Sequence, residues 1–156
     1  MVKASPILNK RIGCHRANMH VTKTNSKAEP LSSDKNSLDG LNSHLAVVDE
    51  YHAHPTSHVY NVLKSSMGSR LQPLMMTITT AGFNVDGPCY QLSRTCKEVL
   101  EGKKEDESLL ALIYELDEDD DWKDEEVWIK ANPSLHESIS MDYLREQSVQ
   151  ARNYGG

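Results

Sequence analysis

The chain has 156 residues, of which 38% are hydrophobic and 26% charged, and it carries a formal net charge of −6. This length fits one domain or part of one. An acidic surface repels a nucleic-acid backbone, so the composition by itself shows no DNA-binding signature. No apolar run approaches the roughly 18 residues of a membrane span. The N-terminus is also not followed by an apolar run as long as that of a signal peptide. We therefore expect neither membrane insertion nor secretion.

The N-terminal part predicts little regular structure. Residues 7–13 fit the end of a helix, and the alternation in residues 19–24 predicts a strand at a sheet edge or in a hairpin. Residues 26–42 are rich in Ser, Asn and Asp, which predicts a surface loop. A mobile segment above a nucleotide site is the alternative interpretation of that stretch.

Two apolar runs in the middle of the chain predict neighbouring strands. Residues 44–50 end in two adjacent carboxylates, and residues 71–80 run into a Thr-Thr-Ala-Gly sequence. Short runs rich in β-branched residues and bounded by turn residues are typical of buried parallel strands. A helix is predicted between them, from near Pro55 and Thr56 to Gly68, and a strand–helix–strand unit places its strands in parallel. Their carboxyl ends therefore meet at the edge where open α/β sheets bind ligands.

The second half predicts further elements of both kinds. A helix is predicted over residues 88–102 and a third strand over residues 109–114. Residues 115–126 hold nine acidic side chains, which predicts a solvated, self-repelling turn, and the lack of glycine in this run argues against a calcium loop. Helices are predicted over residues 128–132 and 141–152. Together these elements predict a three-layer α/β fold with a mostly parallel sheet.

The cysteines favour packing over chemistry. Cys14, Cys89 and Cys96 lack C-x-x-C spacing, and an odd set of this kind is typical of reduced thiols in a cytosolic protein. Cys89 and Cys96 share one face of the predicted helix, so we expect both in the hydrophobic core and not as metal ligands.

The residues suited to chemistry gather at the two strand ends. Asp49 can hold Mg²⁺, and Glu50 can orient or deprotonate a water molecule. The hydroxyl groups of Thr79 and Thr80 can sense a γ-phosphate. A nucleotide-hydrolysing sheet needs this combination. A structural strand end with solvated acids is the alternative.

Several histidines and an arginine near these strands are open to more than one interpretation. His52 and His54 predict a polar loop near the phosphates. With Asp49 and His58 they could form a zinc site instead, although further ligands with suitable spacing are missing. Arg70, in the turn before the second strand, could reach a phosphate of a neighbouring subunit as an arginine finger. An ordinary surface arginine is the alternative.

An ordered set of sequence blocks covers most of the chain, roughly residues 25–150. The blocks are residues 38–42, 47–54, 72–74, 79–82, 114–117, 120–122, 131–135 and 140–144. In this order they resemble the ATPase domain of tailed-phage terminase large subunits. The ordered set is specific, whereas residues 49–52 alone (Asp-Glu-Tyr-His) also match the DExH box of a helicase.

The resemblance implies a role for each matching residue. Asp49 matches the Walker B aspartate that holds Mg²⁺ through water, and Glu50 matches the catalytic glutamate that activates the attacking water. A coupling motif, which relays γ-phosphate occupancy to DNA movement in the family, is matched by Thr79, Thr80, Ala81 and Gly82. The complete domain would be a P-loop NTPase of the ASCE, RecA-like type that uses ATP and Mg²⁺.

The resemblance also implies partners and a location. The family moves double-stranded viral DNA into procapsids as a homo-oligomeric ring, with a small terminase subunit and the portal, in the cytoplasm of the bacterial host. A separate nuclease domain cuts the DNA. On this basis residues 1–118 would be a partial ATPase domain. Residues 119–156 would be an acidic turn and helical linker towards the nuclease domain.

The sequence departs from the family pattern at two points. It contains no G-x-x-x-x-G-K-[ST] motif, and without this phosphate-cradling loop most nucleotide affinity is lost. It also stops where the family's nuclease domain would begin. We therefore expect a fragment, for example from a prophage, that lacks the P-loop strand and does not hydrolyse ATP alone. A DExH helicase-like ATPase fragment and a non-catalytic α/β binding module remain as alternatives.

Overall fold

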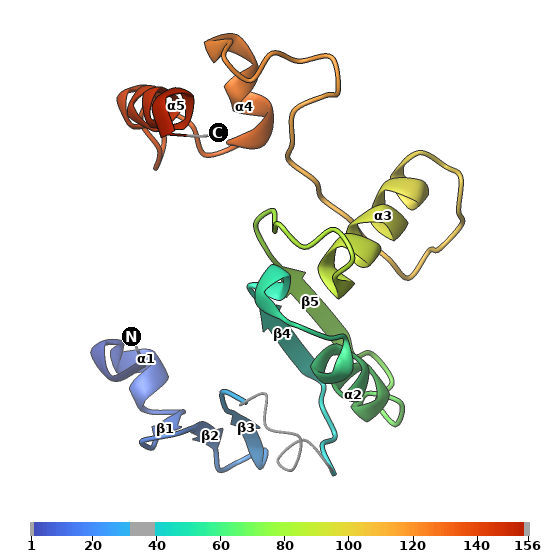
Figure 1. Ribbon diagram of the computed structural model, residues 1–156. Helices are drawn as coiled ribbons and strands as arrows, with labels where there is room; N and C mark the ends of the chain where they lie inside the picture. The colour runs from blue at the N-terminus through green and yellow to red at the C-terminus, as the bar shows by residue number, and fades with distance from the viewer. Residues whose placement is uncertain (1, 32–39, 155–156) are drawn as a thin grey trace. The chain divides into compact units, whose positions relative to one another are not determined.

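The computed structural model describes residues 2–31 and 40–154 (Figure 1). The chain divides into two compact units, Met1–Thr95 and Cys96–Gly156. The boundary falls within helix α3 (Pro88–Leu100), which therefore contributes residues to both units. The functional division expected after residue 118 stays a prediction, because compactness does not report on function.

Short elements make up the N-terminal part of the first unit. They are the 3-10 helix η1 (Val2–Ala4), helix α1 (Pro6–Asn9) and strands β1 (Gly13–Cys14), β2 (Met19–Val21) and β3 (Ser26–Ala28). The strands form an antiparallel sheet in the order β1-β2-β3. Ser5 caps α1 by accepting a hydrogen bond from the Leu8 N–H at 3.4 Å, and Pro6 occupies the first turn, where its missing N–H does no harm.

This sheet confirms one expectation and corrects another. The predicted strand near residue 19 exists and is a hairpin member, but β2 lies between β1 and β3 and is not an edge strand. Residues 26–28 were expected in a loop and form β3 instead. Their exposed side chains show no hydrophobic alternation, so this strand depends on backbone pairing with β2, which the sequence pattern does not reveal. Residues 32–39 of the expected loop lie outside the described residues.

Strands β4 (Leu45–Asp49) and β5 (Leu74–Ile78) pair in parallel, with helix α2 (His58–Ser66) between them in the chain. The predicted strand–helix–strand unit is confirmed. The register pairs the first residues of the two strands with each other and likewise Asp49 with Ile78. The chain therefore leaves both strands at the same edge of the sheet.

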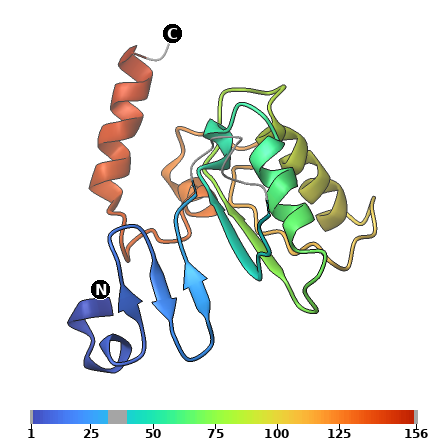
Figure 2. The ribbon, with the colours of Figure 1, turned by 90° about the horizontal axis from the view of Figure 1, so that it is seen from below.

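One face of the β4–β5 pair carries the hydrophobic core of this unit. The core consists of Ala46, Val48, Tyr51, Leu63 and Met67, with partly buried residues such as Val59, Met75, Cys89 and Leu92 packed against it. Figure 2 shows α2 and α3 on the same side of the two strands. The expected core position of Cys89 is confirmed. Cys96 is half-buried, which raises the pKa of its thiol, and its expected place in the core stays a prediction.

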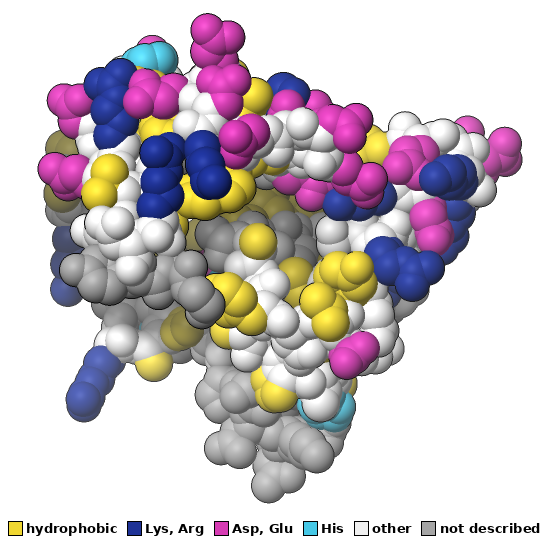
Figure 3. Space-filling model, turned by 45° about the horizontal axis from the view of Figure 1, so that its top comes forward, with side chains coloured by type: hydrophobic (Ala, Val, Ile, Leu, Met, Phe, Trp, Pro, Cys, Tyr) yellow, Lys and Arg dark blue, Asp and Glu magenta, His cyan; other side chains and the backbone are white. Residues whose placement is uncertain are grey.

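The other face of the β4–β5 pair is exposed. It presents side chains that are 45–57% exposed, namely Leu45, Val47, Leu74, Met76 and Ile78. Exposed hydrophobic side chains are visible among charged ones in the space-filling view of Figure 3.

The fold differs from the expected mostly parallel sheet. The structure has one parallel pair of strands and one antiparallel sheet. A third layer is not formed by the part of the first unit that the structure describes.

Residues 109–114 do not form the predicted third strand. The odd-numbered residues of this segment are half-buried and the even-numbered ones exposed, which is the alternation of a strand. A strand also needs a hydrogen-bonded neighbour, and no described strand pairs with this segment. The prediction of a third strand was therefore wrong for the part of the chain that the structure describes.

The second unit contains the 3-10 helix η4 (Glu125–Val127) and the helices α4 (Trp128–Ala131) and α5 (Met141–Tyr154). The predicted helix ends are confirmed: α4 stops before Pro133, and the Ser140 hydroxyl accepts from the Tyr143 N–H at 3.2 Å at the start of α5. None of the helices described here is long and apolar enough to cross a membrane.

Basic residues hold part of the acidic segment 115–126. Lys130 lies 2.6 Å from Asp117 and 2.8 Å from Asp120. Arg145 of α5 lies 2.7 Å from Glu125. Asp117 and Glu125 are solvated as expected, but the expected self-repulsion was wrong for these carboxylates, because each is paired with a basic side chain. Their partners come from α4 and α5, more distant in the chain than a local charge pattern can show.

Candidate functional site

The carboxyl ends of β4 and β5 bring predicted residues side by side. Asp49 ends β4 and pairs with Ile78 at the end of β5, so Glu50 and Thr79 are the first residues beyond the paired strands. All three polar residues are exposed. The two strand ends thus form one polar surface, as the spacing along the chain predicted.

The backbone at Glu50 is unusual. Glu50 has φ 49° and ψ 48°, in the left-handed region, which costs a non-glycine residue roughly 1 kcal/mol. The turn directs Tyr51 into the core, where it is 2% exposed and its ring lies 5.3 Å from that of Tyr60. Burial, with smaller effects of Tyr60 and Cys89, raises the pKa of Tyr51. The Glu50 side chain stays 60% exposed, so Tyr51 anchors a turn that presents a carboxylate to solvent.

His52 connects the two strand ends. Its backbone N–H donates to Thr79 Oγ1 at 3.0 Å. Its ring Nδ1 lies 3.0 Å from the same Oγ1, 3.4 Å from Thr80 Oγ1 and 3.3 Å from the Glu50 carboxylate. These contacts join residues that are 27 and 28 positions apart in the chain.

The predicted coupling residues pack against the same histidine. A Cβ atom added at Gly82 would lie 2.7 Å from the Cβ of His52, so only glycine permits this approach. Ala81 is exposed between Thr80 and Gly82. Residues 79–82 are therefore attached to the turn after β4 by hydrogen bonds at one end and by close packing at the other.

Asp49 offers an exposed carboxylate at the edge of the sheet. Its Oδ1 accepts a hydrogen bond from the Glu50 N–H at 3.0 Å. Mg²⁺ commonly binds one or two carboxylates and keeps several water molecules, so a single exposed aspartate fits that ion. A zinc site needs three or four protein ligands. Over residues 2–31 and 40–154, no group of three His, Cys, Asp or Glu side chains could hold a metal ion.

The structure does not bring Arg70 and His54 into this cluster. The Arg70 guanidinium donates to the Asn42 carbonyl at 2.7 Å, just before β4 begins, so it lies at the opposite end of the strands from Asp49. The ring of His54 packs at 5.4 Å against the buried ring of Tyr51. The role of Arg70 as an arginine finger in a neighbouring subunit stays a prediction.

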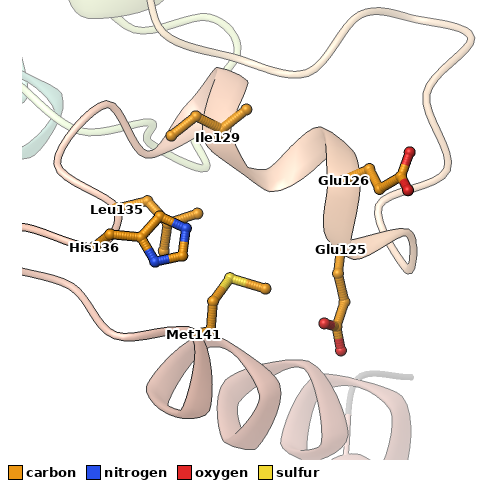
Figure 4. A pocket seen from close by; sticks show the side chains of 6 residues that line it. All are labelled: Glu125, Glu126, Ile129, Leu135, His136 and Met141. Carbon is orange, nitrogen blue, oxygen red and sulfur yellow. The ribbon is translucent and has the colours of Figure 1, made fainter.

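A separate hollow of about 480 Å³ lies in the second unit. Figure 4 shows its lining, which consists of Glu125, Glu126, Ile129, Leu135, His136 and Met141. The carboxylates of Glu125 and Glu126 point in different directions (Figure 4), and Glu125 is already paired with Arg145. These side chains do not converge on one point, so we place the candidate site at the strand ends.

Sequence reasoning missed one residue that builds the site. Tyr51 supports the Glu50 turn and is part of the core, but it was not singled out. Tyr51 begins the 3-10 helix η3 (Tyr51–Ala53), which is too short to show the periodicity that reveals burial in longer helices and strands. The sequence feature that could have indicated the burial of Tyr51 is its place between the polar residues Glu50 and His52, directly after a buried strand.

Comparisons with known proteins agree with this picture. The family described as "Terminase large subunit, ATPase domain" matches residues 1–98. Protein YmfN of Escherichia coli (strain K12) is 46% identical over 115 residues, which make up 74% of this chain and 25% of YmfN. The crystal structure of the HK97 bacteriophage large terminase matches with a TM-score of 0.82 and 23% identity, over 99% of this chain and 32% of that one. The chain thus spans about a quarter and a third of their respective lengths.

Proposed function

Because this chain belongs to the family of terminase large subunit ATPase domains, we propose that it supplies the acidic part of an ATP-hydrolysing site. The observation that carries the proposal is the parallel register of β4 and β5, which places Asp49 and Glu50 beside Thr79. The hydrogen bonds of His52 to Thr79 support it, because they tie the acidic turn to the coupling residues.

Each residue of the cluster has a role that its geometry suits. Asp49, exposed at the strand end, would hold Mg²⁺ through a water molecule. Glu50, held outward by its left-handed turn, orients the attacking water and accepts its proton. The hydroxyls of Thr79 and Thr80 respond to the γ-phosphate. When bound with ATP, Mg²⁺ neutralises charge on the phosphate oxygens.

Hydrolysis also requires a loop that cradles the phosphates, and a G-x-x-x-x-G-K-[ST] sequence would supply it. The printed sequence contains no such motif. In our proposal the loop comes from polypeptide outside these residues, and the complete fold is a three-layer P-loop NTPase of the ASCE, RecA-like type. The exposed apolar face of β4–β5 supports this, because parallel sheets are ordinarily covered on both faces.

For the longer protein, we propose the activity of a phage DNA-packaging motor. Its partners would be double-stranded DNA, the small terminase subunit and the portal, and it would work as a homo-oligomeric ring in the cytoplasm of the bacterial host. The family match supports this proposal. The solved HK97 protein is named as a bacteriophage large terminase.

The metal site can be tested by NMR with Mn²⁺, a paramagnetic substitute for Mg²⁺, added with millimolar ATP. We expect selective broadening of the amide signals of residues 49–52 and 79–82, and its loss in Asp49→Asn. Broadening at the acidic residues 115–126 should be the same in both proteins, which provides an internal control. Equal broadening at residues 49–52 in Asp49→Asn would instead support a non-catalytic binding module.

A further inference from the structure

We propose that His52 is a positioning residue: its Nδ1–H joins the Glu50 carboxylate to the coupling hydroxyls, so that a change at one strand end is transmitted to the other. The significance of this link for hydrolysis rests on the proposed function. The link itself exists in the chain without nucleotide and can be tested there.

Counting protons assigns the state of the histidine ring. The Thr79 hydroxyl has one proton, which it donates to the Thr80 carbonyl at 2.9 Å. Towards Nδ1 of His52, at 3.0 Å, the same oxygen can therefore only accept. The proton of this hydrogen bond must then reside on Nδ1, which makes His52 the Nδ1–H tautomer when it is neutral.

The other contacts of the ring agree with this assignment. The Glu50 carboxylate lies 3.3 Å from Nδ1 and can only accept, so a proton on that nitrogen makes this contact favourable. The His52 backbone N–H donates to Thr79 Oγ1 at 3.0 Å, which occupies one of the two lone pairs of this oxygen and leaves the other for the proton on Nδ1. One Nδ1–H thus lies between an acceptor from each strand end.

The surroundings keep the ring in this position. Tyr51, the preceding residue, is anchored in the core, and Gly82 packs against the Cβ of His52. The His52 side chain is only 28% exposed. Because the ring is confined, a shift of Glu50 alters the hydrogen bond available to Thr79 and Thr80. His52 acts through these residues and does not itself touch the reacting atoms.

The tautomer can be read directly from the ¹⁵N signals of the histidine ring in the full chain. In the neutral ring of His52 we expect a protonated Nδ1 and an unprotonated Nε2. The exposed His58, with no comparable contacts to the strand ends, provides the reference for an ordinary ring. A protonated Nε2 with a bare Nδ1 at His52 would overturn the assignment.

Transmission can be tested with a mutant cycle that needs no nucleotide. Glu50→Gln should shift the methyl signals of Thr79 and Thr80 in the wild-type background. In the His52→Ala background this shift should fall by at least half. His52→Asn, whose amide group occupies the place of Nδ1, should restore it, whereas His52→Gln, which extends one carbon further, should not.

The controls separate positioning from packing. His58→Ala should leave the shift caused by Glu50→Gln unchanged. If His52→Ala does not fold, the comparison of His52→Asn with His52→Gln still tests the proposal. Both side chains carry an amide group, but only that of Asn occupies the place of Nδ1. An undiminished shift in both His52→Ala and His52→Gln would refute the positioning role. If the Mn²⁺ broadening near Asp49 is not observed but the mutant cycle gives the expected result, the proposed function is refuted and the positioning role of His52 is retained.

Discussion

At Glu50 the chain adopts φ 49° and ψ 48° directly after the last paired residue of β4, and the side chain in this position is charged and largely exposed. Such a conformation persists only where the surroundings impose it, and it concentrates at functional sites. Here the burial of Tyr51 imposes it, since the chain must turn sharply to place that ring in the core. The residue that bears the strain is also the one to which the proposed function assigns the activation of water.

This strain leads to an unusual stability order. Glu50→Gly should be more stable than Glu50→Ala by about 1 kcal/mol, because glycine adopts the left-handed region without steric cost. In most structured positions alanine is the more stable of the two. Urea unfolding of the two variants provides the measurement, and the reverse order would show that the turn relaxes when the carboxylate is removed.

At the scale of elements, the two faces of β4 differ in what they contact. Val48 is 3% exposed within the core, whereas its neighbour Val47 is 53% exposed on the opposite face. The two positions carry the same side chain in the same strand. They therefore offer a matched pair for testing which face supports the fold.

Val48→Ala should lower the free energy of unfolding by about 2 kcal/mol, through lost burial and the cavity it leaves. Val47→Ala should change it by less than about 0.5 kcal/mol, because little buried surface is lost. Denaturant unfolding of both variants checks the difference. Equal losses would mean that the exposed face is covered in solution.

The elements also show how far sequence reasoning reaches. The β4–α2–β5 unit and the edge that joins Asp49 to Thr79 could be predicted, because burial, helix signals and turn residues agreed there. Strand β3 could not, since exposed Ser26 and Lys27 carry no pattern and depend on pairing. Residues 109–114 failed in the opposite way, with a clear pattern but no partner strand among those described. The His52 link was not predicted, because hydrogen bonds between the 3-10 helix Tyr51–Ala53 and the residues after β5 leave no periodic pattern in the sequence.

At the scale of the molecule, the two units are stabilised by different forces. The first has an apolar core behind β4 and β5, whereas the second relies in part on ion pairs at its surface. The hydrogen bond from Lys130, with that of the Asp117 N–H, lowers the pKa of Asp120 below its ordinary 3.8. Arg145 similarly lowers the pKa of Glu125 below its ordinary 4.5.

These directions predict how the second unit responds to acid. A carboxylate with a lowered pKa contributes stability that is fully present above its ordinary pKa and is lost as the pH falls through the lowered value. We expect a ¹³C titration of Asp120 to have its midpoint below 3.8, the ordinary value. In Lys130→Gln the midpoint should rise, and in Lys104→Gln it should not. An unchanged midpoint in Lys130→Gln would refute the pairing in solution.

The uncovered face of β4–β5 also affects how this chain behaves when made on its own. Five aliphatic side chains side by side on a parallel pair form a cohesive surface of the kind that drives association and precipitation. The net charge of −6 opposes this through mutual repulsion between molecules, and salt weakens that repulsion. The colloidal stability of the isolated chain therefore depends on ionic strength, and dilute, low-salt buffer is the condition in which it stays dispersed.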